Sequence, residues 1–490
     1  MRKILPFIFL FSRAIAQNPG DNLFNAPIIH DVYLNFTQTG WWDSLLASHT
    51  TDREVIASII VDGSSFDSVN VKTKGNSSFN NSSSKKSFRL DFNDFLTGQS
   101  IDGMDQINLN NNFKDPTMLR EKICLDFMNA NGVTAPRCSY ARVYLNNSYW
   151  GLYNLVERID KTFLDTHFGN NSGNLFKGDP NGDMRWINST PSSYYSKYEL
   201  KTNTVVNDWS DLVHYLDKIN NSGAALEDSL PTVLDINPWL RAWAANILFA
   251  NMDSYQGSGH NYYIYDEAGT DLFEYIAWDV NEAFGNFQNG LTLSSIKTLS
   301  VYYIPTPVNA RPLETNMLAI TNFKNQYLTV VCEMINGDFD TSKLFHVIDS
   351  LSNWIRTDVY ADPNKFFPNP QFEQNLSSDV GNVPGLKDFL TQHIASVKAE
   401  LAFWGCTLNG IDEELATISS VFPNPASDEI IFHNTNIAPV RFSLINQLGQ
   451  TVWSQELSNG LTRIDIRTLP AGMYYLSGGT RVSQKILIAR

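Results

Sequence analysis

Two acidic residues follow apolar runs in the middle of the chain. Asp253 comes just after the run 238–250 and just before the glycine-rich stretch 257–261, and Asp279 follows a second apolar run. Two carboxylates and the amide oxygen of Asn261 are hard ligands of the kind that Mg²⁺ takes when it shares phosphate oxygens. Asp, Asn and Gly also serve in turns and caps, and the spacing alone leaves that interpretation open.

Charged side chains that suit phosphates gather earlier, around short alternating segments. Lys74 ends one segment, Lys86 and Arg89 open the next, and Glu157 ends a third. Enzymes that transfer phosphoryl groups fix charge with a Lys held by a Glu, because positioning and charge stabilisation do most of the work. These four residues are therefore candidate nucleotide-binding residues. A solvated strand edge is the simpler interpretation of the same cations.

Two periodicities indicate how these groups are positioned. Alternation of period two predicts a β-rich lobe over residues 17–157, and apolar residues at helical spacing predict a mainly helical lobe over 158–406, with 238–250 as its clearest helix. This is an α+β arrangement, and the cleft between the lobes is the expected site. The predicted strands of the first lobe are 54–61, 69–74, 87–92, 141–145 and 149–157.

The last segment has the pattern of a small all-β domain. Short strand-like runs separated by Gly, Pro and Asn recur over residues 421–490, which predicts a small β-sandwich after a linker at 407–420. The segment has no cluster of catalytic groups. Catalysis is therefore expected in the body of the chain.

Composition narrows the class of partner. The chain has 490 residues, of which 43% are hydrophobic and 18% charged, so it is globular. Its net charge of −15 argues against nucleic acid and anionic lipid as partners, because phosphate contacts need a cationic surface. Residues 421–490 hold 6 basic and 4 acidic residues, so the acidic excess lies in the body. We expect that body to attract a basic protein substrate.

The amino terminus predicts export. Arg2 and Lys3 precede a short apolar run, and residues 14–16 supply small residues for cleavage, so residues 1–16 are interpreted as a secretory signal peptide. No later stretch is long and apolar enough to predict a transmembrane segment. Four cysteines in an oxidising compartment allow two disulfides, with the first two as the local pair; buried free thiols are the alternative. The cysteines are Cys124, Cys138, Cys332 and Cys406.

Five ordered motifs resemble the CotH kinase family, the atypical protein kinases similar to spore coat protein H. The resemblance covers about residues 30–405. It implies a two-lobed fold like that of an atypical protein kinase, with ATP and Mg²⁺ as cofactors. The motifs are Lys74-Gly75-Asn76-Ser77-Ser78, Lys85-Lys86-Ser87-Phe88-Arg89-Leu90, the stretch 151–160, Asn251-Met252-Asp253 with His260-Asn261-Tyr262-Tyr263, and the stretch 278–285.

The resemblance also implies roles for single residues. Asp253 is similar to the family's catalytic aspartate, Asp279 to its metal-binding aspartate, and Asn261 to a second metal contact. Lys86 and Glu157 resemble the charges on the nucleotide side. The chain has neither the GxGxxG loop nor the HRD triplet of ordinary protein kinases.

The carboxyl-terminal segment resembles the sorting domain of type IX secretion. This resemblance implies passage through the periplasm, export across the outer membrane by the type IX machinery, and release or anchoring at the cell surface. The motifs are Phe422-Pro423-Asn424-Pro425, the stretch 446–450, the stretch 469–475 and the basic end 485–490.

Two hypotheses of function follow from the sequence. The first is a secreted or surface protein kinase that transfers the γ-phosphate of ATP to Ser or Thr of a protein. The second is a surface binding or adhesion protein that keeps the same fold without catalysis. A hydrolase that uses Asp253 and Asp279 as its carboxylate pair is a third idea, which the order of the motifs does not support.

Overall fold

The computed structural model describes residues 18–51, 53–403, 418–422, 426–434, 440–446, 450–457, 460–478 and 481–489. The chain divides into two compact units, Met1–Cys406 and Thr407–Arg490. The predicted signal peptide and most of the predicted linker lie outside the described residues. Among the helices that are described, none has the length and apolar character to cross a bilayer.

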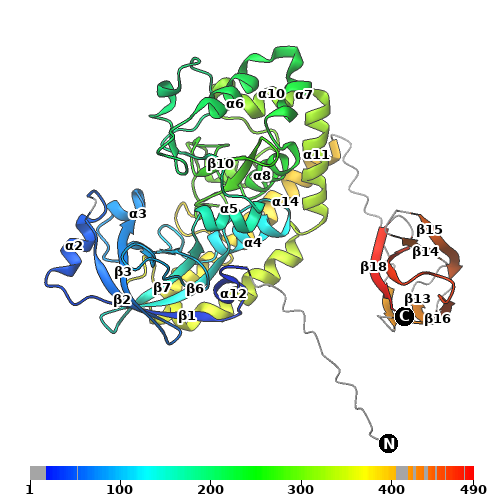
Figure 1. Cartoon of the computed structure of the whole chain (residues 1–490), viewed down its shortest axis with the longest axis horizontal. Helices are drawn as coiled ribbons and strands as arrows, with labels where there is room; N and C mark the ends of the chain where they lie inside the picture. Colours follow the sequence, from blue (N-terminus) through cyan, green and yellow to red (C-terminus); the bar gives the residue numbers. More distant parts are fainter. Residues whose placement is uncertain are drawn as a thin grey trace, which may run out of the picture. The chain divides into compact units, whose positions relative to one another are not determined.

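The first part of the larger unit is a closed β-barrel (Figure 1). The strand order around it is β1-β2-β3-β4-β5-β7-β6, and β6 closes it by pairing in parallel with β1. The β-rich amino-terminal lobe is thus confirmed. Its strands are β1 Ile29–Asn35, β2 Ile56–Val61, β3 Ser64–Lys74, β4 Ser87–Asp91, β5 Gln106–Asn110, β6 Cys138–Leu145 and β7 Ser148–Glu157. Its helices are α1 Asp21–Phe24, α2 Trp41–Ala47, α3 Ser77–Asn80 and α4 Arg120–Ala130.

Alternation along the barrel strands separates an apolar interior from a polar outer face. Val71, Phe88 and Leu109 belong to the buried barrel core. Their neighbours along the strands point the opposite way, because successive side chains of a strand face opposite sides. Across the strands, Lys74 lies opposite Ser87, Lys72 opposite Arg89, Arg89 opposite Asn108, and Asn110 opposite Asn154. The outer face of β3, β4, β5 and β7 therefore carries a continuous polar patch.

The second part combines helices with a small sheet of order β11-β10-β8-β9. The helices agree with the sequence prediction, but β8, β9 and β10 were not predicted. The first two are too brief for alternation to show, and β10 is buried at nearly every position, so its residues do not alternate. The strands are β8 Leu175–Gly178, β9 Tyr198–Leu200, β10 Tyr262–Glu267 and β11 Leu272–Ala277. The helices are α5 Lys161–Phe168, α6 Ser210–Asn221, α7 Leu226–Ser229, α8 Ile236–Leu248, α9 Leu293–Lys297, α10 Pro312–Ala319, α11 Thr321–Asn336, α12 Thr341–Ala361, α13 Asn369–Asn375 and α14 Leu386–Phe403.

Helix α8 lies at the centre of this part. Asp235 caps it by accepting a hydrogen bond from the Asn237 backbone N–H at 3.3 Å, so the helix begins two residues before the predicted start. Trp239 and Trp243 are fully buried on it. The helix ends at Leu248, and the polar loop that carries Asp253 follows directly.

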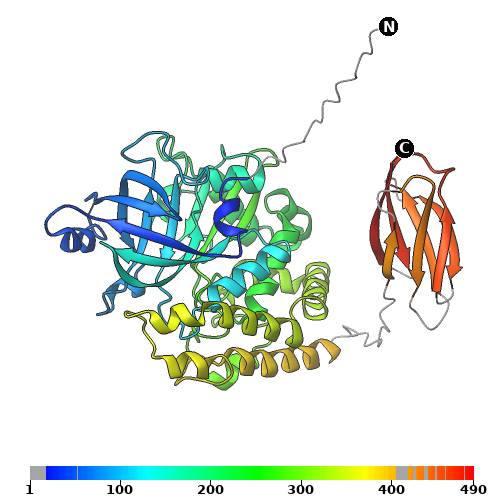
Figure 2. The ribbon, with the colours of Figure 1, turned by 90° about the horizontal axis from the view of Figure 1, so that it is seen from below.

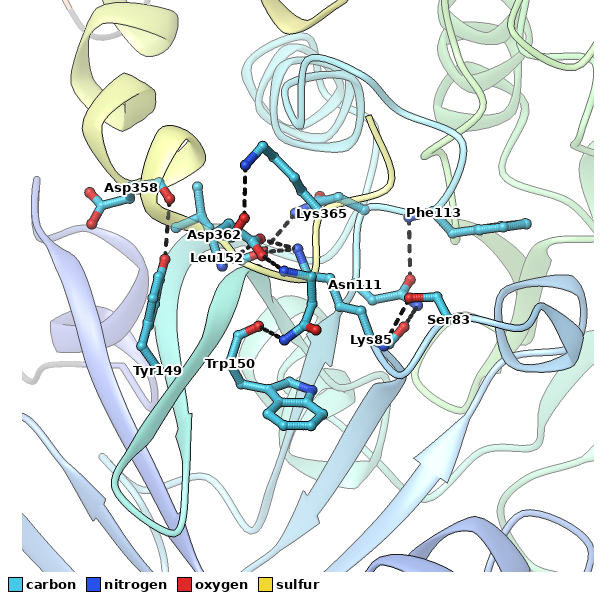
Figure 3. Close-up of polar contacts among 12 residues, drawn as sticks. Ser83, Lys85, Asn111, Phe113, Tyr149, Trp150, Leu152, Asp358, Asp362 and Lys365 are labelled. Carbon is cyan, nitrogen blue, oxygen red and sulfur yellow. Dashed lines mark hydrogen bonds and ion pairs between the residues drawn. The ribbon is translucent and has the colours of Figure 1, made fainter. Parts of the chain in front are cut away.

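Helix α12 connects the helical part back to the barrel. It packs beside α14 (Figure 2), and its carboxyl-terminal end meets β7. There Asp362 accepts hydrogen bonds from Lys85 Nζ at 2.6 Å and from the Leu152 backbone N–H at 3.0 Å (Figure 3). The side chains of Lys85 and Asp362 are both 0% exposed. Gly151 is needed beside them, since a Cβ there would lie 2.6 Å from the Asp362 carboxylate.

The cysteine prediction is partly wrong. Cys124 on α4 and Cys138 at the start of β6 are free thiols, both buried, and burial raises the pKa of each thiol. The alternative of buried free thiols therefore holds for this pair. Cys332 is disulfide-bonded, and Cys406 lies outside the described residues.

The smaller unit consists of two sheets with one shared core. Ile430 and Ile464 from one sheet and Leu444 and Leu476 from the other belong to a single hydrophobic cluster, as the predicted β-sandwich requires. Strand β12 begins three residues before the predicted boundary at 421. The strands are β12 Ile418–Phe422, β13 Glu429–Asn434, β14 Val440–Asn446, β15 Thr451–Leu457, β16 Gly460–Asp465, β17 Gly472–Gly478 and β18 Arg481–Ile488.

The buried Lys85–Asp362 pair generates a stability prediction. Lys85→Met leaves a buried carboxylate without its partner, and we expect it to lower the free energy of unfolding by about 3–5 kcal/mol. Lys85→Met/Asp362→Leu should cost less than Lys85→Met alone, because no charge then remains buried. Urea denaturation followed by tryptophan fluorescence measures both variants.

The matched control for this pair is Lys343→Met, which breaks the exposed ion pair with Asp338. It should cost less than about 0.5 kcal/mol, since exposed pairs contribute little. A loss for Lys85→Met as small as this would show that the buried pair does not hold α12 to the barrel.

Candidate active site

A cleft of about 210 Å³ collects polar groups from both parts of the larger unit. Its lining comes from the end of β3, the loop after β5, helix α4, the loops after β8 and α8, and the segment after β11. The lining residues are Lys74, Gly75, Asn76, Ser77, Ser78, Ser87, Asn110, Asn111, Asn112, Glu121, Asp179, Pro180, Asp253, His260, Asn261, Asp279, Asn281 and Glu282.

Asp253 is held by its own loop. His260 Nε2 lies 2.8 Å from Asp253 Oδ1, and Asn261 Nδ2 donates to Asp253 Oδ2 at 3.0 Å and to the Asp253 backbone carbonyl at 2.9 Å. Burial lowers the pKa of His260, but the hydrogen bond and charge of Asp253 more than offset this, so that the pKa is raised. Ser258 Oγ also donates to Asp253 Oδ1, at 3.2 Å. The carboxylate is thus oriented from both oxygens.

Arg311 holds the loop that carries Asp253 in place. Its guanidinium donates to the backbone carbonyls of Tyr255 and Gly257, the second at 2.5 Å. Arg311 is 6% exposed. The loop is therefore held on both sides of Gln256, and Asp253 is positioned through it.

Asp279 lies two residues after the end of β11 in a left-handed conformation, with φ of 54°. Such a φ is uncommon outside glycine and marks a position held by its surroundings. Burial raises the pKa of Asp279, Lys74 opposes the rise, and the charge of Asp253 adds to it. The two carboxylates therefore repel each other across the cleft, and a cation between them would relieve that repulsion.

Lys74 reaches the cleft from the end of β3. Its Nζ donates to Asn110 Oδ1 at 2.7 Å and lies 5.0 Å from the centroid of the Trp278 ring. Burial lowers the pKa of Lys74 to about 8, and Asp279 works against that shift. Asn110 also donates from Nδ2 to Glu121 Oε1 at 2.7 Å, so Lys74 and Glu121 hold opposite ends of one amide.

Glu121 on α4 is the acidic partner that the sequence prediction missed. Asn110 and Asn154 donate to its two carboxylate oxygens, at 2.7 and 2.9 Å. Burial raises the pKa of Glu121 to about 7, and the charge of Asp279 adds to the rise. Its place in the first turn of an amphipathic helix is an ordinary capping position, so the sequence carried no signal for its role.

Glu282 was also missed. It is 5% exposed, lines the cleft and accepts a hydrogen bond from Lys114 Nζ at 2.8 Å. A signal for it was available in the sequence, because Glu282 comes three residues after Asp279 in the same polar segment.

The structure brings four of the predicted site residues together. Lys74, Asp253, Asn261 and Asp279 all line the cleft. Arg89 does not line it; it lies on the same outer face of the barrel and lines a neighbouring pocket together with Lys74.

Lys86 and Glu157 lie away from the cleft. Lys86 Nζ donates to the backbone carbonyls of Phe79 and Asn81, at 2.6 and 2.7 Å, and so fastens the loop around α3. Glu157 pairs with Arg137, whose Nη2 lies 2.5 Å from Glu157 Oε1. Burial raises the pKa of Glu157, but the neighbouring His167 and the hydrogen bonds and charge of Arg137 more than offset this, so that the pKa is lowered. Lys86 and Glu157 are each one residue away in the sequence from a position on the outer face of the barrel. Their side chains therefore do not point toward the cleft.

The comparisons with known proteins agree with this arrangement. Residues 71–396 match the family described as CotH kinase protein. The chain belongs to this family. Residues 420–489 match a secretion system C-terminal sorting domain, of the type IX class, which indicates secretion to the cell surface.

Three relatives share the CotH region. The chain is 24% identical to the inner spore coat protein H of Bacillus subtilis, over 64% of this chain and 83% of the relative. It is 23% identical to the invasin CotH2 of Rhizopus delemar, over 62% of this chain and 56% of the relative. It is 20% identical to the invasin CotH3 of the same fungus, over 54% and 46% respectively. The chain thus spans about half the length of the two fungal relatives.

The donor set of the cleft fits a cation that shares its ligands with phosphate. Among the residues that the structure describes, no group of three or more His, Cys, Asp and Glu is placed to hold a metal ion. Asp253 and Asp279 with Asn261 nevertheless offer hard oxygen ligands. Mg²⁺ is usually bound through one or two carboxylates plus substrate phosphates, so a complete protein cage is not required.

Glu314 on α10 yields a pH prediction. It is 0% exposed, and burial raises its pKa to about 8, with Gln256 and Arg311 opposing the rise. The folded protein then holds a proton that the unfolded chain releases above its ordinary pKa. The stabilising effect is full below about pH 4.5 and is lost as the pH rises toward 8.

Glu314→Gln removes this titration. The free energy of unfolding of the variant, minus that of the unchanged protein, should therefore grow between pH 5 and 8, by about 1.4 kcal/mol per pH unit. Urea denaturation at several pH values measures it. The exposed Glu227→Gln is the control and should show no such slope; parallel pH profiles for all three proteins would contradict the prediction.

Proposed function

We propose that this protein is a secreted or surface protein kinase that transfers the γ-phosphate of ATP to a Ser or Thr hydroxyl of a protein. One observation carries the proposal: a single cleft holds two carboxylates, Asp253 and Asp279, beside a lysine that an amide links to a buried glutamate. Phosphoryl transfer needs such positioned charges more than covalent catalysis. In this proposal the barrel and the helical part correspond to the two lobes of an atypical protein kinase.

Asp253 is the proposed catalytic residue. The acceptor oxygen attacks the γ-phosphorus, the bond to the oxygen bridging the β- and γ-phosphates breaks, ADP leaves, and the acceptor proton passes to the Asp253 carboxylate. His260 and Asn261 keep that carboxylate facing the acceptor. Asp279, with Asn261, would hold Mg²⁺, which neutralises charge on the phosphate oxygens when bound.

The nucleotide has room beside the cleft. A second pocket of about 390 Å³ shares Lys74, Asn261 and Asp279 with the first. Trp278 and Tyr263 line it, with ring centroids 5.9 Å apart in a T-shaped arrangement. An aromatic wall suits the flat face of a purine, so we propose that the base occupies this pocket and the phosphates extend past Lys74 toward Asp253.

The cellular setting of the proposal follows from the sorting domain. Export would pass through the periplasm and the type IX machinery to the outer surface, where the protein is released or anchored. The net charge of the chain, −15, favours a basic protein as the phosphate acceptor.

A surface binding or adhesion protein is the second candidate. Two of the relatives are named invasins, which favours it. Calorimetry with the full chain separates the two functions: binding of ATP with Mg²⁺ supports the kinase, whereas no affinity for either, together with binding to a glycan or host protein, supports adhesion.

The kinase proposal predicts the behaviour of two carboxylate variants. The full chain with labelled ATP, Mg²⁺ and a basic Ser-containing protein should incorporate phosphate, and Asp253→Asn or Asp279→Asn should reduce the rate by roughly 10²–10⁴-fold. Asp271→Asn, on an exposed turn, is the matched control and should keep the full rate. Equal incorporation by all four proteins would refute the proposal.

Lys74 and Lys86, which the sequence could not distinguish, should behave differently in the same assay. Lys74→Met should raise the KM for ATP at least tenfold, because its Nζ lies in the cleft. Lys86→Met should leave that KM unchanged and lower the free energy of unfolding by about 1–3 kcal/mol, because two carbonyls lose their donor. The reverse pattern would indicate that Lys86, and not Lys74, binds the phosphates of ATP.

A further inference from the structure

A basic pocket lies beside the cleft, in a chain that is acidic as a whole. Its volume is about 260 Å³, and its lining includes Lys72, Lys74, Arg89, Arg158 and His49 together with three hydroxyl side chains. None of the described residues that line it carries a carboxylate. The chain as a whole has a net charge of −15, so this concentration of positive charge around one pocket requires an explanation.

The strand register makes the pocket electrostatically unfavourable when it is empty. Lys72 on β3 lies directly opposite Arg89 on β4, and like charges opposite one another across a sheet are destabilising. Burial lowers the pKa of Arg89, and the charge of Arg158 lowers it further. The charges of Asp91 and Asp94 raise this pKa, but each has a smaller effect than burial or Arg158.

The cations of this pocket make no direct ion pair. Within the described part of the chain, the half-buried Lys72, Arg89 and Arg158 take part in no ion pair, and the acidic charges that act on two of them do so without direct contact, Asp91 and Asp94 on Arg89 and Asp160 on Arg158. The buried Lys85, by contrast, pairs directly with Asp362. Arg158 Nε is a buried donor without a hydrogen-bond partner among the described residues. Buried donors are normally satisfied, so a missing acceptor is implied.

A buried amide next to Arg89 is unsatisfied as well. Asn108 pairs directly with Arg89 across β4 and β5, so the two side chains share one face of the barrel. Asn108 is 0% exposed, and neither its Nδ2 nor its Oδ1 has a partner in the described structure. Asn108 does not itself line the pocket, so the argument for a ligand there rests on the cations and on the unpaired Arg158 donor.

We propose that Lys72, Arg89 and Arg158 form a subsite for a phosphate group, distinct from the position of the transferred phosphate at Asp253 and Asp279. Guanidinium groups bind phosphate oxygens through paired hydrogen bonds, and several cations together match a dianion. The subsite also adjoins the second pocket, with which it shares Lys74 and Arg158. It takes a phosphate dianion, supplied either by the chain of a nucleotide or by a separate phosphate compound. The proposal does not depend on phosphoryl transfer.

The test is isothermal titration calorimetry of the full chain with inorganic pyrophosphate. The unchanged protein should bind it, with an affinity that falls as salt concentration rises. Arg89→Gln/Arg158→Gln should weaken binding at least tenfold. Arg185→Gln is the control: it removes one charge at an exposed position outside the pocket and should leave the affinity unchanged.

Thermal unfolding without ligand separates binding from a structural role. Arg89→Gln removes the repulsion from Lys72, so the variant should have a Tm equal to or above that of the unchanged protein, and pyrophosphate should no longer raise its Tm. No pyrophosphate binding by the unchanged protein, or a lower Tm for ligand-free Arg89→Gln, would overturn the proposal.

Titration with ATP identifies the source of the phosphate. Competition between ATP and pyrophosphate assigns the subsite to the phosphate chain of the nucleotide, and simultaneous binding assigns it to a separate phosphate compound; both results support the subsite if both need Arg89 and Arg158. Asp279→Asn should leave pyrophosphate binding intact even if it abolishes phosphate transfer, so failure of the proposed kinase function and failure of the subsite remain distinguishable.

Discussion

Alternation across β3, β4, β5 and β7 is the constraint on which the rest of the structure depends. The barrel interior takes the apolar residues of these strands, so every second residue must face outward. Lys74, Arg89 and Asn110 belong to that outward set, and the helical part supplies the opposite wall with Asp253 and Asp279. A shift of one residue in any of these strands would exchange the charges of the cleft for apolar side chains.

The cleft is assembled around charges that the protein does not neutralise by itself. Burial raises the pKa of Asp279 and Glu121 and lowers that of Lys74, which means that each charged form is disfavoured where it stands. Asn110 joins Lys74 to Glu121 and keeps the two at a fixed separation. Such an arrangement suits a polyanionic ligand with its own metal ion, because the ligand completes the charge balance. The unpaired cations around Arg89 extend the same principle to the next pocket.

The two walls of the cleft depend on contacts between distant segments. Helix α12 returns to the barrel and places Asp362 against Lys85 and Leu152, behind the loop 110–112 that lines the cleft. Asn111 of the cleft wall donates from Nδ2 to the Lys85 carbonyl at 2.6 Å, so a hydrogen bond joins the wall directly to a residue of the buried ion pair. The position of this cleft wall therefore depends on the packing of α12, which lies far from it in the sequence.

The sequence by itself determined a β-rich part, a mainly helical part and the sorting domain, and it predicted Asp253 and Asp279 as site residues, because each of these rests on a local pattern of residues. It could not choose between Lys74 and Lys86, or between Glu121 and Glu157, because neighbouring charges look alike until strand register assigns each one a face. Only the tertiary structure decided that Lys74 and Glu121 meet through Asn110. The same register, set by pairing between strands far apart in the sequence, brought Lys72 and Arg89 together.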